Sequence, residues 1–240
     1  MRKGFFGKTA LVAALISLGF NVSLAQNFQE IRLKGTFPFG NFDRIGETSE
    51  MLQNNEIGSG AANGISAGYR YSFELGSGIL LHVGGDIMWN NTCSRYREIC
   101  RNFNGQTAPT YFNFPMWVGV SLRTPLFNST RFVGYLGACA GLNVHYTTST
   151  GWKNFEVRYK PSFSPALSLE AGVNYRKISL GVELLTLGTP TIRGTGEETH
   201  HKFRTLEKKR SMLMANVVLS YKLSKQKREW RPARKMDFDM

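Results

Sequence analysis

The sequence predicts an all-β protein, an eight-stranded antiparallel transmembrane β-barrel of the outer-membrane type. Polar and apolar residues alternate along eight segments, each about as long as a tilted strand needs to cross a bilayer. The links between these segments are short and long in turn, and the polar faces combine Gly and Ser with charges of both signs. The chain after residue 25 contains no apolar run long enough for a membrane-spanning helix. We therefore expect it to cross a membrane as strands closed into a barrel.

Residues 1–25 have the pattern of a secretory signal peptide. Arg2, Lys3 and Lys8 precede an apolar run over residues 9–20, and Ser23-Leu24-Ala25 follows. A basic region, a short hydrophobic core and a small-x-small site predict cleavage after Ala25. Loss of these three cations lowers the formal charge from +13 to +10. Export makes nucleic acid an unsuitable partner for this basic chain, and anionic lipid headgroups, polyanionic cell-envelope polymers or an acidic protein fit better.

The barrel is predicted over residues 26–223. Its strands are expected at residues 30–39, 64–75, 79–90, 111–123, 131–146, 164–175, 178–186 and 211–223. The clearest pair is LSLEAGVNYRKISLGVELL, where period two runs on both sides of Arg176-Lys177, the form of a β-hairpin. Long links are expected at residues 40–63, 91–110, 147–163 and 187–210. Short periplasmic turns and long external loops, with an even strand number, place both termini in the periplasm.

The composition of the two faces predicts which one points inward. The polar faces are crowded with Gly and Ser, whereas the wetted strands of a soluble sheet usually carry longer side chains. The interior of an eight-stranded barrel is just wide enough for side chains to fill it, so the small residues should point inward and the leucines toward lipid. Outward aromatic residues form two belts: Trp89, Phe112, Phe114 and Tyr146 toward the long loops, and Tyr71, Phe73, Tyr175 and Tyr221 toward the short turns. Such belts match the two bilayer interfaces.

Ten charged residues fall on inward positions. They are Glu30, Arg32, Lys34, Arg70, Glu74, Asp86, Arg123, Glu170, Glu183 and Lys222. Five cations meet five carboxylates, and buried charges persist only when they are paired and hydrogen-bonded. We therefore expect a salt-bridge network that plugs the lumen. The alternative is incidental surface charge on a soluble sheet.

The cysteines and one proline give local expectations. Cys93 and Cys100 lie in the polar stretch CSRYREIC, and an oxidising exported compartment favours a disulfide between them over two unpaired loop thiols. Cys139 lies inside an alternating strand and is expected to be a small packing residue. Pro115 interrupts a predicted strand and predicts a bulge near the outer rim.

Three stretches carry a family resemblance. YFNFPMWVGVSLRTP, followed by RFVGYLGACAGLNV, and the closing KKRSMLMANVVLSYKL resemble the paired and last strands of the PorT-like outer-membrane β-barrel family of Bacteroidetes, over about residues 28–223. The resemblance implies an integral, porin-like outer-membrane barrel without known catalysis, and some members are components of the type IX secretion system. One departure is the C-terminus. Many outer-membrane barrels end in an aromatic residue, but here seventeen residues follow Leu223.

Those seventeen residues, 224–240, form a basic tail that we expect in the periplasm. Arg228, Trp230 and Arg231 are its candidate docking residues for secretion-machine or periplasmic proteins, because Trp and Arg often anchor interfaces. The alternative is a solvated tail. The loop ETHHKFRTLEKKR is expected to face outward, where its cations could pair with the phosphates of lipopolysaccharide.

No catalytic, metal or cofactor site is predicted. GxSxG, HExxH and CxxC motifs are absent from the sequence, His82 and His145 point into the lumen by alternation, and His200-His201 lie in a loop. The absence of these motifs favours a non-enzymatic barrel, and the resemblance implies a binding and scaffolding accessory for type IX secretion in the bacterial outer membrane. An autonomous structural or minor porin-like barrel is the first alternative. A lipid-modifying outer-membrane enzyme is the second.

Overall fold

The computed structural model describes residues 25–43, 60–76, 78–102, 107–127, 129–152, 155–198, 201–202, 206–209 and 211–223. The expected signal peptide, except for Ala25, and the basic tail lie outside these residues. The helices in the described part of the chain include none with the length and hydropathy to cross a membrane.

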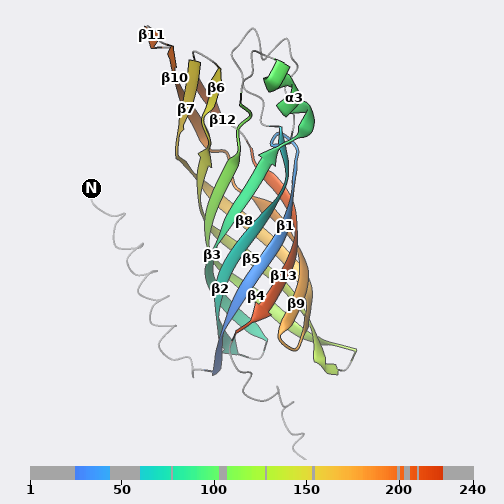
Figure 1. The fold of residues 1–240 in the computed structure, drawn as a ribbon. Helices are drawn as coiled ribbons and strands as arrows, with labels where there is room; N and C mark the ends of the chain where they lie inside the picture. The colour runs from blue at the N-terminus through green and yellow to red at the C-terminus, as the bar shows by residue number, and fades with distance from the viewer. Residues whose placement is uncertain are drawn as a thin grey trace, which may run out of the picture.

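Eight antiparallel strands close into a barrel, as the sequence predicts (Figure 1). They are β1 (Ala25–Phe39), β2 (Ala61–Gly76), β3 (Ile79–Thr92), β4 (Tyr111–Leu126), β5 (Ser129–Thr147), β8 (Ser162–Tyr175), β9 (Ile178–Thr186) and β13 (Leu213–Lys222). Each strand pairs with its neighbours in chain order, and β13 closes the barrel on β1 in a continuous register from Glu30–Lys222 to Phe39–Leu213. Each of the eight predicted segments coincides with one barrel strand.

The three short turns lie together at one end of the barrel and the long connections at the other (Figure 1). Each short turn contains a residue in the left-handed region: Gly78 with φ 87°, Phe127 with φ 55° and Arg176 with φ 55°. Positive φ at the turn matches the twist of the flanking strands. At Gly78 a Cβ would also stand 2.7 Å from the carbonyl oxygen of Arg123, so glycine is required there by space as well.

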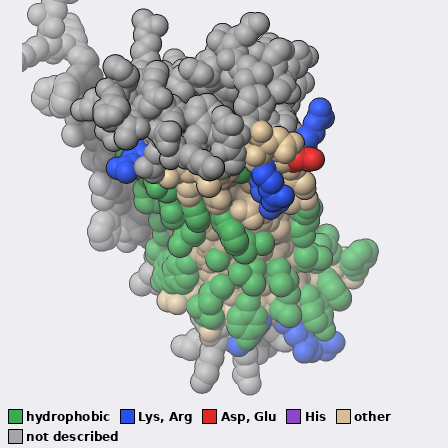
Figure 2. All heavy atoms as spheres, turned by 45° about the horizontal axis from the view of Figure 1, so that its top comes forward, with side chains coloured by type: hydrophobic (Ala, Val, Ile, Leu, Met, Phe, Trp, Pro, Cys, Tyr) green, Lys and Arg blue, Asp and Glu red, His purple; other side chains and the backbone are tan. Residues whose placement is uncertain are grey.

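The barrel is apolar outside and polar inside. Along β9 the outward Leu180 and Leu184 are each 59% exposed, whereas the inward Ser179 and Glu183 are 3% and 2% exposed. Figure 2 shows hydrophobic side chains covering the barrel wall, with Lys and Arg gathered toward its rims. This arrangement is stable only where lipid is the outer solvent, so the barrel is transmembrane and the predicted assignment of the faces is confirmed.

A second sheet stands at the long-loop end, beyond the barrel (Figure 1). It consists of β6 (Thr150–Trp152), β7 (Phe155–Lys160), β10 (Thr191–Glu198), β11 (His201–Lys202) and β12 (Leu206–Lys209). The sequence predicts long external links here without predicting their conformation, and the structure shows that two of them form strands. Strand β7 runs on into β8 with only Pro161 between them, and β10 pairs with β7 from Arg193–Lys160 to Glu198–Phe155.

The predicted disulfide between Cys93 and Cys100 is not formed. Both cysteines lie in the described part of the chain, and both are free thiols. The Cys93 carbonyl accepts the Arg97 amide at 3.0 Å, at the start of helix α3 (Ser94–Asn102). Cys93 and Cys100 are seven positions apart, and at the helical rise of about 1.5 Å per residue their Cα atoms lie about 10 Å apart. Disulfides bridge Cα atoms up to roughly 7 Å apart, so the helix keeps these thiols from pairing.

The predicted bulge at Pro115 is also wrong. The β3–β4 pairing is interrupted between Gly85–Met116 and Met88–Asn113, but its register does not shift. Pro115 is buried and stays paired with Asn143 of β5. The missing amide is accommodated by a gap in one ladder, because the other neighbour of β4 keeps that strand in place.

Candidate functional site

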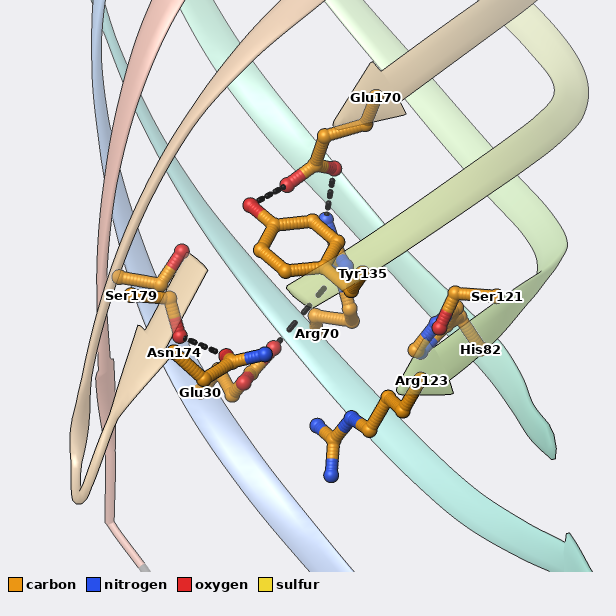
Figure 3. A pocket seen from close by; sticks show the side chains of 10 residues that line it. Glu30, Arg70, His82, Ser121, Arg123, Tyr135, Glu170, Asn174 and Ser179 are labelled. Atoms are coloured by element: carbon orange, nitrogen blue, oxygen red, sulfur yellow. Dashed lines mark hydrogen bonds and ion pairs between the residues drawn. The ribbon is translucent and has the colours of Figure 1, made fainter. Parts of the chain in front are cut away.

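The middle of the lumen is crossed by a cluster centred on Glu170 of β8. Arg32 of β1 and Arg70 of β2 each place an Nη2 atom 2.5 Å from Oε2 of Glu170. The Tyr135 hydroxyl of β5 donates to Oε1 of Glu170 at 2.7 Å. Three side chains, from β1, β2 and β5, thus contact the Glu170 carboxylate of β8. Figure 3 shows two of them, Arg70 and Tyr135, converging on it.

A second cluster centres on Lys34 of β1. Its ammonium group donates to Oδ2 of Asp86 and to Oε2 of Glu183, both at 2.8 Å. Trp117 Nε1 donates to the same Asp86 oxygen at 2.7 Å, and Asn216 Nδ2 donates to the same Glu183 oxygen at 2.7 Å. The Lys34 side chain is fully buried. Such a buried charge is tolerated because two carboxylates neutralise it, and each carboxylate accepts one further hydrogen bond, from Trp117 or from Asn216.

An apolar layer occupies part of the long-loop half of the lumen, next to a buried hydrogen-bonded group of Asn113, Asn143 and His145, and the sequence analysis did not foresee it. Its buried members include Phe42, Met88, Tyr111, Leu185, Leu187, Met212 and Met214. Met88, Leu185 and Met214 occupy inward positions of β3, β9 and β13. The sequence did contain a signal for this layer, because large apolar residues stand at inward positions of the predicted strands, among the polar ones. The lumen is therefore closed by an apolar layer above the two charged clusters.

A polar cavity lies at the short-turn end of the lumen (Figure 3). Its lining residues are Glu30, Arg70, His82, Ser121, Arg123, Tyr135, Glu170, Asn174, Ser179 and Ser220. His82 bridges two walls, with Nδ1 2.8 Å from Ser72 Oγ and Nε2 2.6 Å from Ser121 Oγ. Both ring nitrogens of His82 are thus engaged by hydroxyl groups.

The structure brings seven of the ten predicted lumen charges into ion pairs. They are Glu30, Arg32, Lys34, Arg70, Asp86, Glu170 and Glu183, with Glu30 in the longest pair, 3.9 Å from Arg70 Nε. Among the described residues Glu74, Arg123 and Lys222 form no ion pair within 4.0 Å. Arg123 and Lys222 instead contact the Phe28 ring.

Other predicted sites are placed as follows. Arg228, Trp230 and Arg231 lie outside the described residues, as does His200. Cys139 is a free thiol at an inward position of β5, packed against the apolar layer. The part of the chain that the structure describes contains no group of three or more His, Cys, Asp or Glu side chains placed to hold a metal ion.

No protein-family model matches the chain, and no curated protein matches it in sequence. Solved structures with a similar fold include the outer membrane protein OprG from Pseudomonas aeruginosa, at 8% identity and a TM-score of 0.49 over 82% of this chain and 96% of that one. The outer membrane protein AlkL is similar at 12% identity and a TM-score of 0.44, over 85% and 93% of the two chains. Neisserial surface protein A is similar at 12% identity and a TM-score of 0.41, over 80% and 96%.

Proposed function

We propose that this protein resides in the bacterial outer membrane and acts there without catalysis, by binding and scaffolding, as an accessory of type IX protein secretion. The observation that carries the proposal is the closed lumen. Two ion-pair clusters and an apolar layer fill it, so the barrel offers no open path for a solute. A barrel without a path acts through the surfaces that it presents outside the hydrocarbon.

Two surfaces are available for such contacts. One is the sheet of β6, β7 and β10–β12 at the long-loop end, which is external if both termini are periplasmic as we propose. The other is the basic tail, which leaves β13 at the short-turn end and carries Arg228, Trp230 and Arg231. In this arrangement lipid covers the apolar wall, lipopolysaccharide phosphates meet the external cations, and the tail meets secretion-machine or periplasmic proteins.

The two alternatives differ from this proposal in what they require. An autonomous structural or minor porin-like barrel needs no partner. A lipid-modifying enzyme needs a nucleophile and a base near the membrane surface. The Ser72–His82–Ser121 chain has the residue types for nucleophilic chemistry, but it lies inside the barrel wall, where an acyl chain in the bilayer does not reach it.

Affinity purification from gently solubilised outer membranes tests the proposed role. The samples are the full chain, a chain without residues 224–240, and an Arg228→Ala/Trp230→Ala/Arg231→Ala variant. A Lys225→Ala/Lys227→Ala variant is the matched control, because it removes cations and keeps the Trp-centred group. We expect stoichiometric secretion-machine partners with the full chain and the control, and their loss from the other two samples. A barrel without partners in all samples would favour the porin-like alternative.

A further inference from the structure

We infer that the outer wall of the barrel at the short-turn end binds the headgroup of an anionic glycerophospholipid, held by Arg176 and Lys177 of the β8–β9 turn and by Arg131 of β5. The choice of a glycerophospholipid rests on the proposed orientation, because the short turns then lie in the periplasmic leaflet, which consists of such lipids. The binding itself rests on the charges and rings of this rim and not on the proposed role in secretion.

The three short turns differ in charge. The β2–β3 turn has the sequence GSG and the β4–β5 turn the sequence FN, so neither carries a charged side chain. The β8–β9 turn consists of Arg176 and Lys177. Figure 2 shows Lys and Arg side chains at the lower edge of the hydrophobic wall, which is the short-turn end. Among the short turns, positive charge is thus confined to the one between β8 and β9.

A third cation stands beside this turn. The β5–β8 pairing continues in register to Phe132–Tyr175, and Arg131 and Arg176 occupy the next positions of the two chains. Both arginines are exposed. Like charges at facing positions of neighbouring strands repel each other. A phosphate group between them would replace this repulsion with attraction, because a guanidinium binds phosphate through charge-assisted and often bidentate hydrogen bonds.

The neighbouring strands offer no exposed carboxylate to neutralise these cations. In the described part of the chain, β5 and β13 contain no acidic residue, and β8 and β9 contain only Glu170 and Glu183. Both carboxylates belong to the ion-pair clusters of the lumen, and these residues are only 4% and 2% exposed. A ligand of negative charge therefore complements this part of the rim.

Aromatic rings hold the cations at the level of the lipid headgroups. The Arg176 Cζ lies 5.4 Å from the centroid of the Tyr175 ring, and the Lys177 Nζ lies 6.0 Å from that of Tyr221. Both tyrosines face lipid, and such residues mark the interface between hydrocarbon and water. The Phe132 ring lies 4.8 Å from the Tyr175 ring, centroid to centroid. The rim thus offers cations for a phosphate and apolar rings for the glycerol and the first acyl carbons.

Native mass spectrometry of the full-length protein in detergent tests the site, with phosphatidylglycerol and phosphatidylcholine of identical acyl chains as probes. We expect one phosphatidylglycerol to bind with about tenfold or more higher affinity than phosphatidylcholine, and Arg131→Gln/Arg176→Gln/Lys177→Gln to abolish this preference. The matched control is Arg95→Gln/Arg97→Gln/Arg101→Gln, which removes three exposed cations from α3 at the opposite end. It should leave the affinity for phosphatidylglycerol within about twofold.

Two results would overturn the inference. Equal affinities of the unsubstituted protein for the two lipids would mean that the apolar wall alone binds them. An equal loss in the α3 control would mean attraction by diffuse positive charge. Should the rim variant fail to fold, the Nε–H resonance of Arg176 in the unsubstituted protein decides. It should shift and saturate as phosphatidylglycerol replaces phosphatidylcholine in nanodiscs, and a constant resonance would refute the site.

Discussion

At the scale of single residues, shared charges hold the lumen together. Glu170 pairs with two arginines, and Lys34 pairs with two carboxylates. Arg32, Asp86 and Glu183 each have one of these two shared ions as their ion-pair partner. This sharing suits a crowded barrel, because each strand contributes an inward side chain only at every second residue. It also makes the network sensitive to the loss of the shared members.

Replacing Glu170 with Gln should therefore destabilise the barrel strongly. The change leaves Arg32 and Arg70 buried around a neutral amide. Removing one partner of a buried ion pair costs about 3–5 kcal/mol. Urea unfolding in lipid vesicles, followed by tryptophan fluorescence, measures the change. The control is Glu74→Gln, since Glu74 is half-buried and forms no ion pair among the described residues; it should cost about 0.5 kcal/mol or less. Equal losses in both variants would contradict the central role of Glu170.

The cysteines of the α3 region should differ in reactivity. Cys100 is buried, and this burial raises the pKa of its thiol, whereas Cys93 is only half-buried. The thiolate is the reactive form, so a raised pKa leaves less of it at neutral pH. In Cys139→Ser/Cys93→Ser and Cys139→Ser/Cys100→Ser variants we expect maleimide to label Cys93 faster near pH 7. The labelling rate of Cys100 should keep rising with pH above about 8.5, the ordinary pKa of a cysteine thiol. In a Cys139→Ser variant, which keeps both thiols, labelling that appears only after reduction would instead show a disulfide between Cys93 and Cys100.

At the scale of elements, a pair of glycines adapts the β8–β9 hairpin to the network. Gly172 and Gly181 are register partners, and a Cβ on either one would collide with the Tyr135 hydroxyl and a backbone carbonyl. The missing side chains make room for the Tyr135 ring of β5, whose hydroxyl bonds to Glu170. The hairpin therefore shapes the space that the central cluster occupies.

Gly181→Ala should weaken the barrel through Tyr135. Overpacking of this kind typically costs about 1–3 kcal/mol. In a Tyr135→Phe background the same change should cost less, because the hydroxyl that it meets is gone, and a double-mutant cycle by urea unfolding measures the difference. Gly35→Ala is the matched control. A Cβ there meets only the Phe37 ring, at an ordinary 3.6 Å, and should change stability little. Additive losses in the cycle would separate Gly181 from Tyr135.

The barrel strands were predictable because every one of them separates lipid from a filled lumen, which enforces period two. The second sheet was not predictable from the sequence. Its strand β10, TIRGTGEE, contains one large apolar residue and therefore has no alternating pattern to detect. Helix α3 left a weak signal. Its buried Tyr96 and Cys100 are four residues apart, the spacing of one helical face, but this signal was overlooked in a stretch taken for a polar loop.

For the candidate site, alternation identified which charges point inward but not how they pair. Arg32 and Glu170 are 138 residues apart, and their contact depends on how closure of the barrel staggers the strands. The prediction treated all ten charges as one network. In the structure Arg123 and Lys222 remain apart from it at the mouth, which only the arrangement across the lumen reveals.

At the scale of the whole molecule, the lumen changes character along the barrel axis. The polar cavity at the short-turn end is followed by the Glu170 and Lys34 clusters and then by the apolar layer beneath the long connections. An ion crossing the barrel would have to break a buried ion-pair cluster and then pass a close-packed region of apolar and hydrogen-bonded polar side chains. Each step is costly, because a charge leaving its partners in a region of low polarity loses several kcal/mol.

The intact barrel should therefore not conduct ions. In planar lipid bilayers containing 1 M KCl we expect no stable single-channel steps from the purified, folded protein. Its folded state is verified in parallel by the difference in gel mobility between unheated and boiled samples, which folded barrels show. A known open porin, reconstituted in the same way, is the control for the membrane and the recording. Lasting current steps at low voltage would mean that the two clusters and the apolar layer open in the membrane. They would also shift the preferred function from a scaffolding accessory to a porin-like barrel.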